Sequence, residues 1–431
     1  MDGTPNSFWQ LHFDENGASS GPDPAGLVTS IAASGATDLF VMSHGWNNSD
    51  GDANALYEAM FPLIAASPNT PARAAYLGVF WPSIWYPDPP AGGTDASLSG
   101  AQIAMSLTQS VPGAAGQLAQ MGSLIDEGLA HVRAGTGTHA AQGAAVDQFH
   151  GLLQSVFTGT TGTEEDDGEA ALLVSDNPQD DYEALATTMG TAPAAGDAEG
   201  LADVFGAVWN GAKDALRVAS FYQMKARAGT IGANGLAPFL VQLHTAAAAL
   251  RVHLVGHSFG ARLVSFALSG IPSAQESPVA SLTLLQGAFS HWSFTRAADS
   301  PFAKAGALCA VADRVAGPLT STFTAADWAV GRWYPKASFL AQQDNQDVDA
   351  PDRWGGIGAD GYQRVRPGSD VVLPLPAGTA LASGTFYRAD ANAVIKDTSQ
   401  SAFAGAHSDI EHPEVAALIV AAATASASPM G

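Results

Sequence analysis

The stretch RVHLVGHSFGARLV, residues 251–264, decides how this chain is interpreted. An apolar run ends at Val255, the cluster GHSFG follows, and a helix-compatible segment comes next. A strand that turns sharply into a helix can hold a serine hydroxyl out on a strained corner, where a base can reach it. A side chain at Gly256 or Gly260 would collide with the neighbouring strand or the returning helix. The pattern therefore predicts that Ser258 is an activated nucleophile.

The same Gly-x-Ser-x-Gly spacing occurs a second time, at residues 17–21. That copy follows FDEN and precedes PDP, which is the context of a turn and a loop. Ser258, in contrast, has an apolar run before it and ARLVSFALS after it. We therefore exclude Ser19 and keep Ser258.

Short apolar runs alternate with longer helix-like segments along the chain, which is typical of an α/β protein with a largely parallel sheet covered on both faces. Helices are expected at 52–66 and 236–251. The expected strands are FWQLHF near residue 8, TDLFVMS at 37–43, AAYLGVFW at 74–81, RVHLVG at 251–256, SLTLLQG at 281–287, GALCAVAD at 306–313 and GTFYRAD at 384–390.

The interval from Pro82 to about Asp203 interrupts this alternation. Residues 1–82 and 204–431 are expected to form the core domain, and residues 83–203 an inserted cap or lid. A peripheral helical excursion is the alternative. The cap is favoured because the insertion leaves directly after an expected strand, on the side where such sheets bind ligands.

Composition limits the partners of the protein. The 431 residues hold 18 Lys plus Arg against 41 Asp plus Glu, a formal charge of −23, which disfavours nucleic acid and anionic membrane surfaces. A neutral small-molecule, lipid-like or polymeric ester is compatible with this charge. The single cysteine, Cys309, lies in an apolar run and is expected to be a buried strand thiol.

No apolar segment reaches the length of a transmembrane helix, and the first residues lack the pattern of a secretion signal. The expected location is cytoplasmic by default, although the composition is also compatible with unconventional export. The oligomeric state stays open.

A serine hydroxyl needs an imidazole to take its proton and a carboxylate behind that imidazole. Three histidines follow Ser258 in the chain. His407 lies in a loop after the last expected strand and before an apolar terminal helix, which is where the base should lie. His412, next to Pro413, is expected at the start of that helix, and His291 comes too early.

Asp313 is the expected acid, because it ends the expected strand 306–313. A carboxylate there can reach the imidazole from behind. Asp299 is the second choice, and Asp409 is too close in sequence to His407. An end-of-strand cap or an ion pair with Arg314 is the alternative interpretation of Asp313.

An oxyanion hole requires two backbone donors. One should be the amide of Phe259, and the other should come from the loop TDLFVMSHGWNNSDG, through Trp46 or Gly45. His44 is expected to orient this loop. Aromatic residues around Trp81 suggest an apolar acyl or aromatic pocket, although core packing explains some of them equally well. The residues expected at the substrate are His44, Trp81, Trp85, Tyr86 and His257.

The order of these motifs resembles the α/β-hydrolase superfamily. The His-Gly of SHGWNN, the elbow GHSFG, Asp313 and His407 occur in the order of that superfamily. VFWPS and HGWNN are also similar to a group of bacterial α/β hydrolases in which the early loop reads His-Gly-aromatic-Asn. The resemblance implies a Ser-His-Asp hydrolase and an α/β-hydrolase fold, and the long insertion leaves the substrate open.

The sequence thus predicts a serine esterase or lipase that works through an acyl-enzyme. Thioester, amide or acyl-transfer chemistry on the same residues is the alternative, and a non-catalytic binding member of the fold is a further one. No cofactor is expected, and no metal, because the histidines and carboxylates lack the spacing of a ligand pair.

Overall fold

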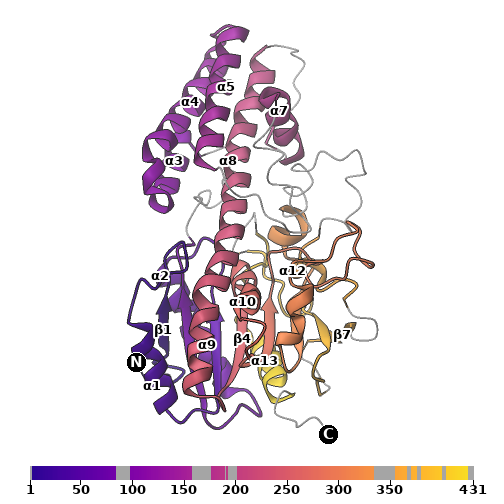
Figure 1. The fold of residues 1–431 in the computed structure, drawn as a ribbon. Helices are drawn as coiled ribbons and strands as arrows, with labels where there is room; N and C mark the ends of the chain where they lie inside the picture. The colour runs from indigo at the N-terminus through magenta and orange to yellow at the C-terminus, as the bar shows by residue number, and fades with distance from the viewer. Residues whose placement is uncertain are drawn as a thin grey trace. The chain divides into compact units, whose positions relative to one another are not determined.

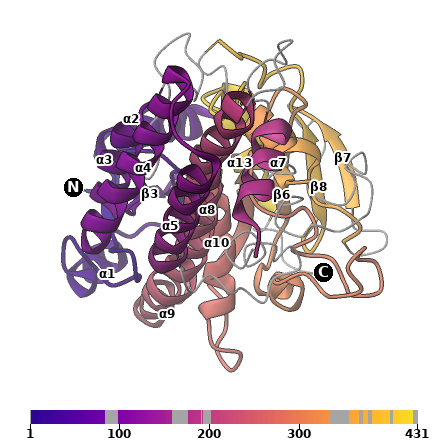
Figure 2. The same cartoon turned by 90° about the horizontal axis from the view of Figure 1, so that it is seen from above.

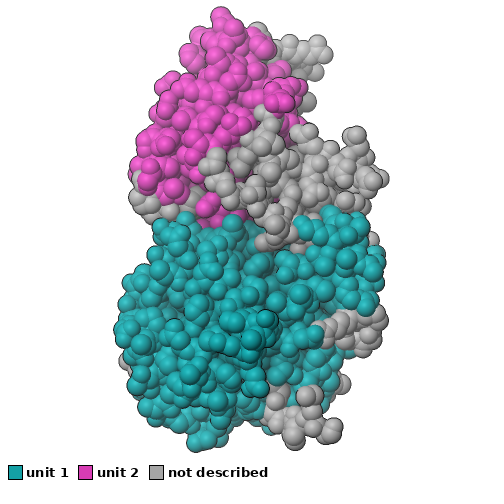
Figure 3. Space-filling view, viewed as in Figure 1, with its two compact units in different colours: residues 1–83, 225–335, 350–431 teal, residues 84–224, 336–349 magenta. Residues whose placement is uncertain are grey.

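The computed structural model describes residues 2–83, 98–157, 176–189, 191–192, 201–333, 355–365, 370–375, 380–399 and 404–425. The chain divides into two units, which Figure 3 colours separately. Unit 1 comprises Met1–Ser83, Lys225–Pro335 and Ala350–Gly431, and unit 2 comprises Ile84–Met224 and Lys336–Asp349. The first boundary lies beside the expected one, whereas unit 2 continues through Met224. The role of the insertion as a cap stays a prediction.

The described part of unit 1 contains one eight-stranded sheet in the order β1-β3-β2-β4-β5-β6-β8-β7 (Figure 1). All its strand pairs are parallel. The predicted α/β class is therefore confirmed. The strands are β1 (Trp9–His12), β2 (Asp38–Ser43), β3 (Ala74–Phe80), β4 (Arg251–His257), β5 (Val279–Leu285), β6 (Leu319–Phe323), β7 (Asp370–Pro374) and β8 (Phe386–Asp390).

The central strands are apolar along nearly their whole length because both faces of the sheet are covered. Every residue of β2 and of β5 is buried. The chain builds the sheet outward in both directions from the β2–β4 pair, so this pair marks the point where the strand order reverses. At such a point the loops at the carboxyl ends diverge and leave a crevice for ligands. The loops that follow Ser43 and His257 both leave the sheet there, with Ser43 paired to Gly256.

Helices α9 and α10 cover one face of the sheet, and helices α2 and α13 cover the other (Figure 2). On the second face, Phe61 of α2 and Ile419 of α13 pack in one core cluster with Phe40, Tyr76 and Val255 of the sheet. The helical segments of unit 1 are α1 (Pro24–Ala33), α2 (Asp50–Ala66), the π-helical segment η3 (Gly232–Leu236), α9 (Ala237–Ala246), α10 (Phe259–Gly270), the 3₁₀ helix η4 (Cys309–Arg314), the π-helical segment η5 (Ala329–Trp333), α12 (Ile357–Asp360) and α13 (Pro413–Ala425).

The segment 306–313 was expected to be a strand, and this prediction is wrong. Its residues from Cys309 on belong to the 3₁₀ helix η4, and Cys309 is half-buried there and not in a strand. The strand at this place in the sheet is β6, LTSTF, whose hydroxyl side chains hid it from a search for apolar runs. Two of these buried hydroxyls have partners: Thr320 Oγ1 donates to Thr283 Oγ1 at 2.9 Å, and Thr322 Oγ1 donates to Gln286 Oε1 at 2.8 Å. The third, Ser321 Oγ, has no partner among the described residues. Edge strand β7 was also not anticipated.

Unit 2 is helical in its described residues. The backbones of its helices α3 and α4 are in direct contact. A Cβ atom at Gly100 would lie only 2.2 Å from the carbonyl oxygen of Gly122, so this contact requires glycine. Among the described helices of the whole chain, none is both long enough and apolar enough to span a bilayer. The helices are α3 (Gly100–Ser110), the 3₁₀ helix η2 (Pro112–Ala114), α4 (Ala115–Ala134), α5 (His139–Val156), α7 (Pro178–Met189) and α8 (Leu201–Ile231), the last of which contributes its final residues to unit 1.

Candidate functional site

Ser258 stands at a sharp turn between β4 and α10. Its backbone has φ 57° and ψ −123°, and α10 begins at the next residue, Phe259. A non-glycine residue in this region costs on the order of 1–3 kcal/mol and persists only where its surroundings impose it. The serine of the expected strand-turn-helix elbow is thus held in the strained conformation that the motif requires.

The two flanking glycines have the roles that the sequence suggested. A Cβ atom at Gly256 would lie 2.4 Å from the Cα atom of Ala261, in the returning helix. A Cβ atom at Gly260 would lie 2.3 Å from the carbonyl oxygens of Ser43 and His44, at the end of the neighbouring strand. Both distances are far below van der Waals contact, so the turn closes only with glycine at both positions.

His407 is the imidazole that meets Ser258. Its Nε2 atom lies 2.7 Å from Ser258 Oγ, so the hydroxyl can donate to it. The ring comes from the loop between β8 and α13, which is bound to the loop after β6: Ala406 N–H donates to Ala326 O at 2.9 Å, and Trp328 N–H donates to Ala404 O at 3.1 Å. The two loops therefore position each other.

Asp327 is the carboxylate on the other side of the His407 ring. Its Oδ2 atom accepts from Nδ1 of His407 at 2.8 Å, and its Oδ1 atom accepts from the N–H of Val330 at 3.0 Å. Asp327 is fully buried. Ser258, His407 and Asp327 thus form a continuous chain of hydrogen bonds, which we call the Ser258–His407–Asp327 chain.

The expected acid, Asp313, does not hold this position. It lies in η4, whereas Asp327 follows β6, the strand next to β5 in the sheet. The carboxylate was expected after the strand beyond β5, and Asp327 does follow that strand, β6, but the segment 306–313 was taken for it. A Thr- and Ser-rich run after Gly317-Pro318 and before Asp327 was the signal that could have identified β6.

The other histidines and carboxylates that the sequence offered as base or acid form contacts elsewhere. Nδ1 of His291 lies 2.9 Å from the carboxylate of Asp360, and Nε2 of His412 lies 2.8 Å from Asp409. The second-choice acid, Asp299, accepts from the guanidinium of Arg296 at 2.6 Å. None of these contacts involves His407 or Ser258.

The loop after β2 approaches the serine closely. A Cβ atom at Gly45 would lie 2.7 Å from Ser258 Cβ and 3.1 Å from Nδ1 of His257. The neighbouring Trp46 ring lies 6.0 Å from the Phe259 ring, centroid to centroid. Gly45, Trp46 and Phe259 therefore lie around the serine, where the expected oxyanion donors belong, and their role as donors stays a prediction.

His44 orients this loop. Its Nε2 atom accepts from the N–H of Trp81 at 3.2 Å, which leaves the proton on Nδ1 to be donated to Gly45 O at 3.0 Å. Burial lowers the pKa of His44 to about 4, so the ring is neutral. Trp81 stacks on this ring, and its Nε1 donates to His44 O at 3.1 Å. Both side chains are buried and bonded to each other's backbone, and their expected place at the substrate stays a prediction.

His257 also acts on the loops. It is buried, and its Nε2 atom donates to the carbonyl oxygen of His407 at 2.9 Å. Burial lowers the pKa of His257 to about 3, so it is neutral as well. The structure thus places His257 against the backbone of the base-bearing loop. The other two expected substrate residues, Trp85 and Tyr86, lie outside the described residues.

These buried neutral histidines make the fold sensitive to acid. Burial lowers the pKa values of His44, His257 and His253, so below pH 6.5 the unfolded chain binds protons that the folded chain does not. The contribution of these histidines to stability is therefore constant above about pH 6.5 and is expected to fall by on the order of 1 kcal/mol per histidine for each pH unit below it. Burial raises the pKa of Asp214 to about 7, so this carboxyl keeps a proton that the unfolded chain loses, and it offsets the effect of about one histidine. Urea unfolding at several pH values between 7 and 4.5 measures this slope.

His257→Gln is the control for this measurement, because glutamine keeps a donor and does not titrate. Its slope should be shallower by about one proton than that of the wild type. Equal urea midpoints at pH 7 and pH 5 in the wild type would show that the buried rings take up protons as easily as the unfolded chain does, contrary to expectation.

A second Ser-His-Asp contact lies at the opposite end of the sheet and has a different character. His253 lies 2.9 Å from Ser281 Oγ through Nδ1 and 2.9 Å from Asp38 Oδ1 through Nε2. Asp38 is also paired with Arg251 at 2.6 Å, and Ser281 lies within regular strand β5, without an elbow. All three side chains of this contact are buried, so it is a structural pairing of β2, β4 and β5.

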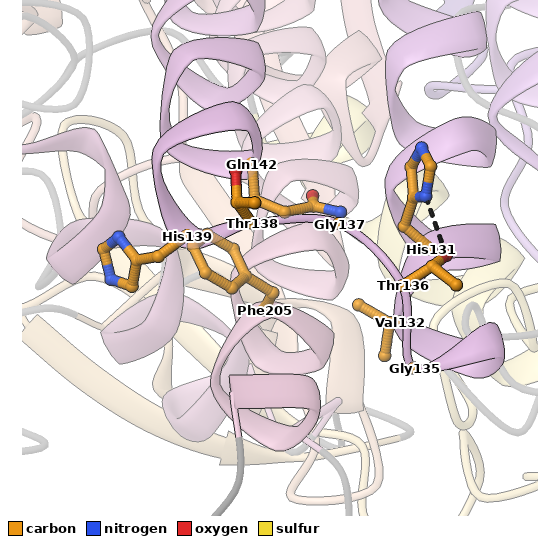
Figure 4. A pocket seen from close by; sticks show the side chains of 9 residues that line it. All are labelled: His131, Val132, Gly135, Thr136, Gly137, Thr138, His139, Gln142 and Phe205. Atoms are coloured by element: carbon orange, nitrogen blue, oxygen red, sulfur yellow. Dashed lines mark hydrogen bonds between the residues drawn. The ribbon is translucent and has the colours of Figure 1, made fainter.

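A small cavity of about 130 Å³ lies in unit 2, at the turn between α4 and α5 (Figure 4). Two of its polar side chains have protein partners: Nδ1 of His131 lies 3.0 Å from Thr136 Oγ1, and Gln142 Oε1 accepts from Nε1 of Trp209, in α8, at 2.8 Å. No residue of the Ser258–His407–Asp327 chain lines it. Within the described ranges, no three His, Cys, Asp or Glu side chains gather as metal ligands.

Comparisons with known proteins add no relative to this picture. No family model, no curated protein and no solved structure matches the chain. The α/β architecture is therefore established by the strands and helices themselves, and a function must be argued from the contacts around Ser258.

Proposed function

We propose that this protein is a serine hydrolase of the α/β-hydrolase type that cleaves a carboxylic ester through an acyl-enzyme. The observation that carries the proposal is the Ser258–His407–Asp327 chain, with contacts of 2.7 and 2.8 Å, at a strained elbow beside the strand-order reversal. In regular structure a serine avoids such a conformation, so the strain itself favours a chemical role over a structural one.

The first half of the reaction forms the acyl-enzyme. Ser258 Oγ attacks the ester carbonyl carbon while His407 Nε2 takes its proton, and the carbonyl electrons move onto oxygen. Asp327 keeps the second imidazole proton on Nδ1 and stabilises the imidazolium. When the tetrahedral intermediate collapses, the bond to the alcohol breaks, and His407 donates the proton to the departing alkoxide.

The second half restores the enzyme. His407 deprotonates a water molecule, whose oxygen attacks the acyl carbon, and the bond to Ser258 Oγ breaks as the proton returns to it. In both halves, the backbone amides of Phe259 and of Gly45 or Trp46 are proposed to stabilise the oxyanion. His44 holds the second of these segments through its bond to Gly45 O.

The ester is proposed as the substrate class because a chain of formal charge −23 repels polyanionic substrates and leaves neutral esters unaffected. Thioester and amide substrates share the same chemistry. A series of p-nitrophenyl esters of increasing acyl length, compared with the matched thioesters and anilides, distinguishes these classes by their kcat/KM values.

The direct test is the intact mass of the full chain after treatment with a fluorophosphonate, followed by peptide mapping. We expect one adduct, on Ser258, in the wild type and none in Ser258→Ala. Ser265→Ala is the matched control, because this buried serine lies on α10 and donates only to Ala261 O. Its labelling should equal that of the wild type. An adduct that persists in Ser258→Ala, or folded wild type that takes up no label, would reject the proposal.

A further inference from the structure

Gln286 immediately follows β5, the strand beside the elbow, and it is fully buried. Its φ is 47°, a left-handed conformation that strains a non-glycine residue. The residues on both sides of it are tied to the nucleophile: Ser258 N–H donates to Leu285 O at 3.0 Å, and Ala288 N–H donates to Ser258 O at 3.2 Å. The backbone of Gln286 is therefore held in place by the elbow itself.

The side-chain amide of Gln286 has one orientation. The backbone N–H of Gln286 donates to Thr322 Oγ1 at 3.1 Å, so the hydroxyl proton of Thr322 is directed to Gln286 Oε1 at 2.8 Å. The Nε2 end then donates to Asp327 Oδ2 at 2.9 Å and to Gly358 O at 3.0 Å. A reversed amide would set Oε1 against two acceptors, which burial makes costly.

The surroundings of Asp327 consist of donors. Its Oδ2 atom accepts from Gln286 Nε2 and from His407 Nδ1, and its Oδ1 atom accepts from Val330 N–H. Three donors around a fully buried carboxylate leave it little freedom to rotate. Of these three donors, Gln286 is the one that belongs neither to the loop after β6, which carries Asp327 and is here called the acid loop, nor to the loop between β8 and α13, which carries His407.

We propose that Gln286 is a positioning residue for the Ser258–His407–Asp327 chain, which fixes the orientation of Asp327 so that its Oδ2 atom faces the imidazole. The proposal rests on the proposed function, because it assigns Gln286 a part in activating Ser258. It also explains the strained backbone, since this conformation lets one residue contact both β6 and the acid loop.

The test is the second-order rate constant for fluorophosphonate labelling of Ser258 in the full chain, measured from pH 5 to pH 9. Gln286→Met removes the donor and keeps the length of the side chain. We expect its labelling rate to fall about 10- to 100-fold, the range expected when a hydrogen bond to a buried charge is lost.

Gln286→Glu sets a second carboxyl group beside Asp327. Two buried carboxyl groups in contact share one proton, so the introduced carboxyl can still donate to Asp327 at low pH, and loss of the shared proton at higher pH sets two like charges together. The labelling rate of this variant should therefore fall on the alkaline side of the pH profile, where the wild-type rate does not. The titratable groups that the structure places in contact with His407 are Asp327 and His257, among the described residues. Burial lowers the pKa of His257 to about 3, so it does not titrate in this range. If Gln286 had only a structural role, its variants would lower the fraction of protein that is labelled and leave the shape of the pH profile unchanged.

Gln363→Met is the matched control, since the Gln363 amide donates to Asp360 O and not to the acid. Thr322→Val is a second variant that removes the hydrogen bonds of Thr322 to Oε1 and to the backbone N–H of Gln286 but keeps the donor to Asp327, and a loss of about 3- to 10-fold is expected. The positioning role would be overturned if the wild type is labelled at Ser258 and the labelling rates of the Gln286 and Thr322 variants lie within twofold of the Gln363 control, with an unchanged pH profile. Absence of labelling in the wild type would instead reject the proposed function, and the positioning role with it.

Discussion

Replacing Ser258 by alanine is expected to lower ester hydrolysis by about 10⁶-fold, and adding His407→Ala is expected to cost little more. The reason is that the two residues act as one unit. Without the hydroxyl, the imidazole has no proton to accept at 2.7 Å, and without the imidazole the hydroxyl is a weak nucleophile. The residual rate would come from backbone donors and substrate binding alone.

The measurement is kcat/KM for a p-nitrophenyl ester in the two single variants and the double variant, each checked for the wild-type unfolding transition. Ser265→Ala should retain the wild-type rate. If the losses of the single variants multiplied in the double variant, Ser258 and His407 would act independently, and the proposed acyl-enzyme route would be wrong.

Asp327→Asn is expected to lower kcat by about 10⁴-fold with little change in KM. Asparagine fits the same space, but it can present its NH₂ group to Nδ1 of His407. The imidazole proton then moves to Nε2, and the ring can no longer accept from Ser258. The loss therefore arises from the wrong tautomer of the base and not from a collapsed site.

Asp313→Asn is the matched comparison, because the sequence pointed to Asp313 and the structure points to Asp327. Its kcat should lie within about twofold of the wild-type value, since Asp313 lies in η4 and the contact to His407 is made by Asp327. A large loss in Asp313→Asn together with an active Asp327→Asn would reverse this assignment.

The elbow and the base could be predicted because their signals are local or ordered along the chain. Gly256, Ser258 and Gly260 lie within five residues, and the steric conflicts that require the glycines arise inside that segment and at the end of one neighbouring strand. His407 was identified by its place between the last expected strand and the terminal helix. The class of the fold followed from the alternation of buried strands and helices.

The acid could not be identified in this way. Its location depends on which segment becomes the strand beyond β5, and the choice between 306–313 and β6 is made by burial on both faces of the sheet. A run of threonine and serine is stabilised as a core strand when the surrounding chain supplies partners for its hydroxyls, as Thr283 does for Thr320 and Gln286 does for Thr322. Apolar periodicity contains no information about those partners.

Covalent neighbours and chain order are enough to define the α/β class, the strained turn at Ser258 and the histidine that meets it. Only the folded chain shows that Asp327 is the carboxylate beside His407 and that Gln286 and His257 form hydrogen bonds to the two loops. Gln286 contacts residues 36, 41 and 72 positions away, and His257 contacts one 150 positions away. Contacts of this range exist only after the sheet has assembled, because strand pairing is what brings the loops to one end.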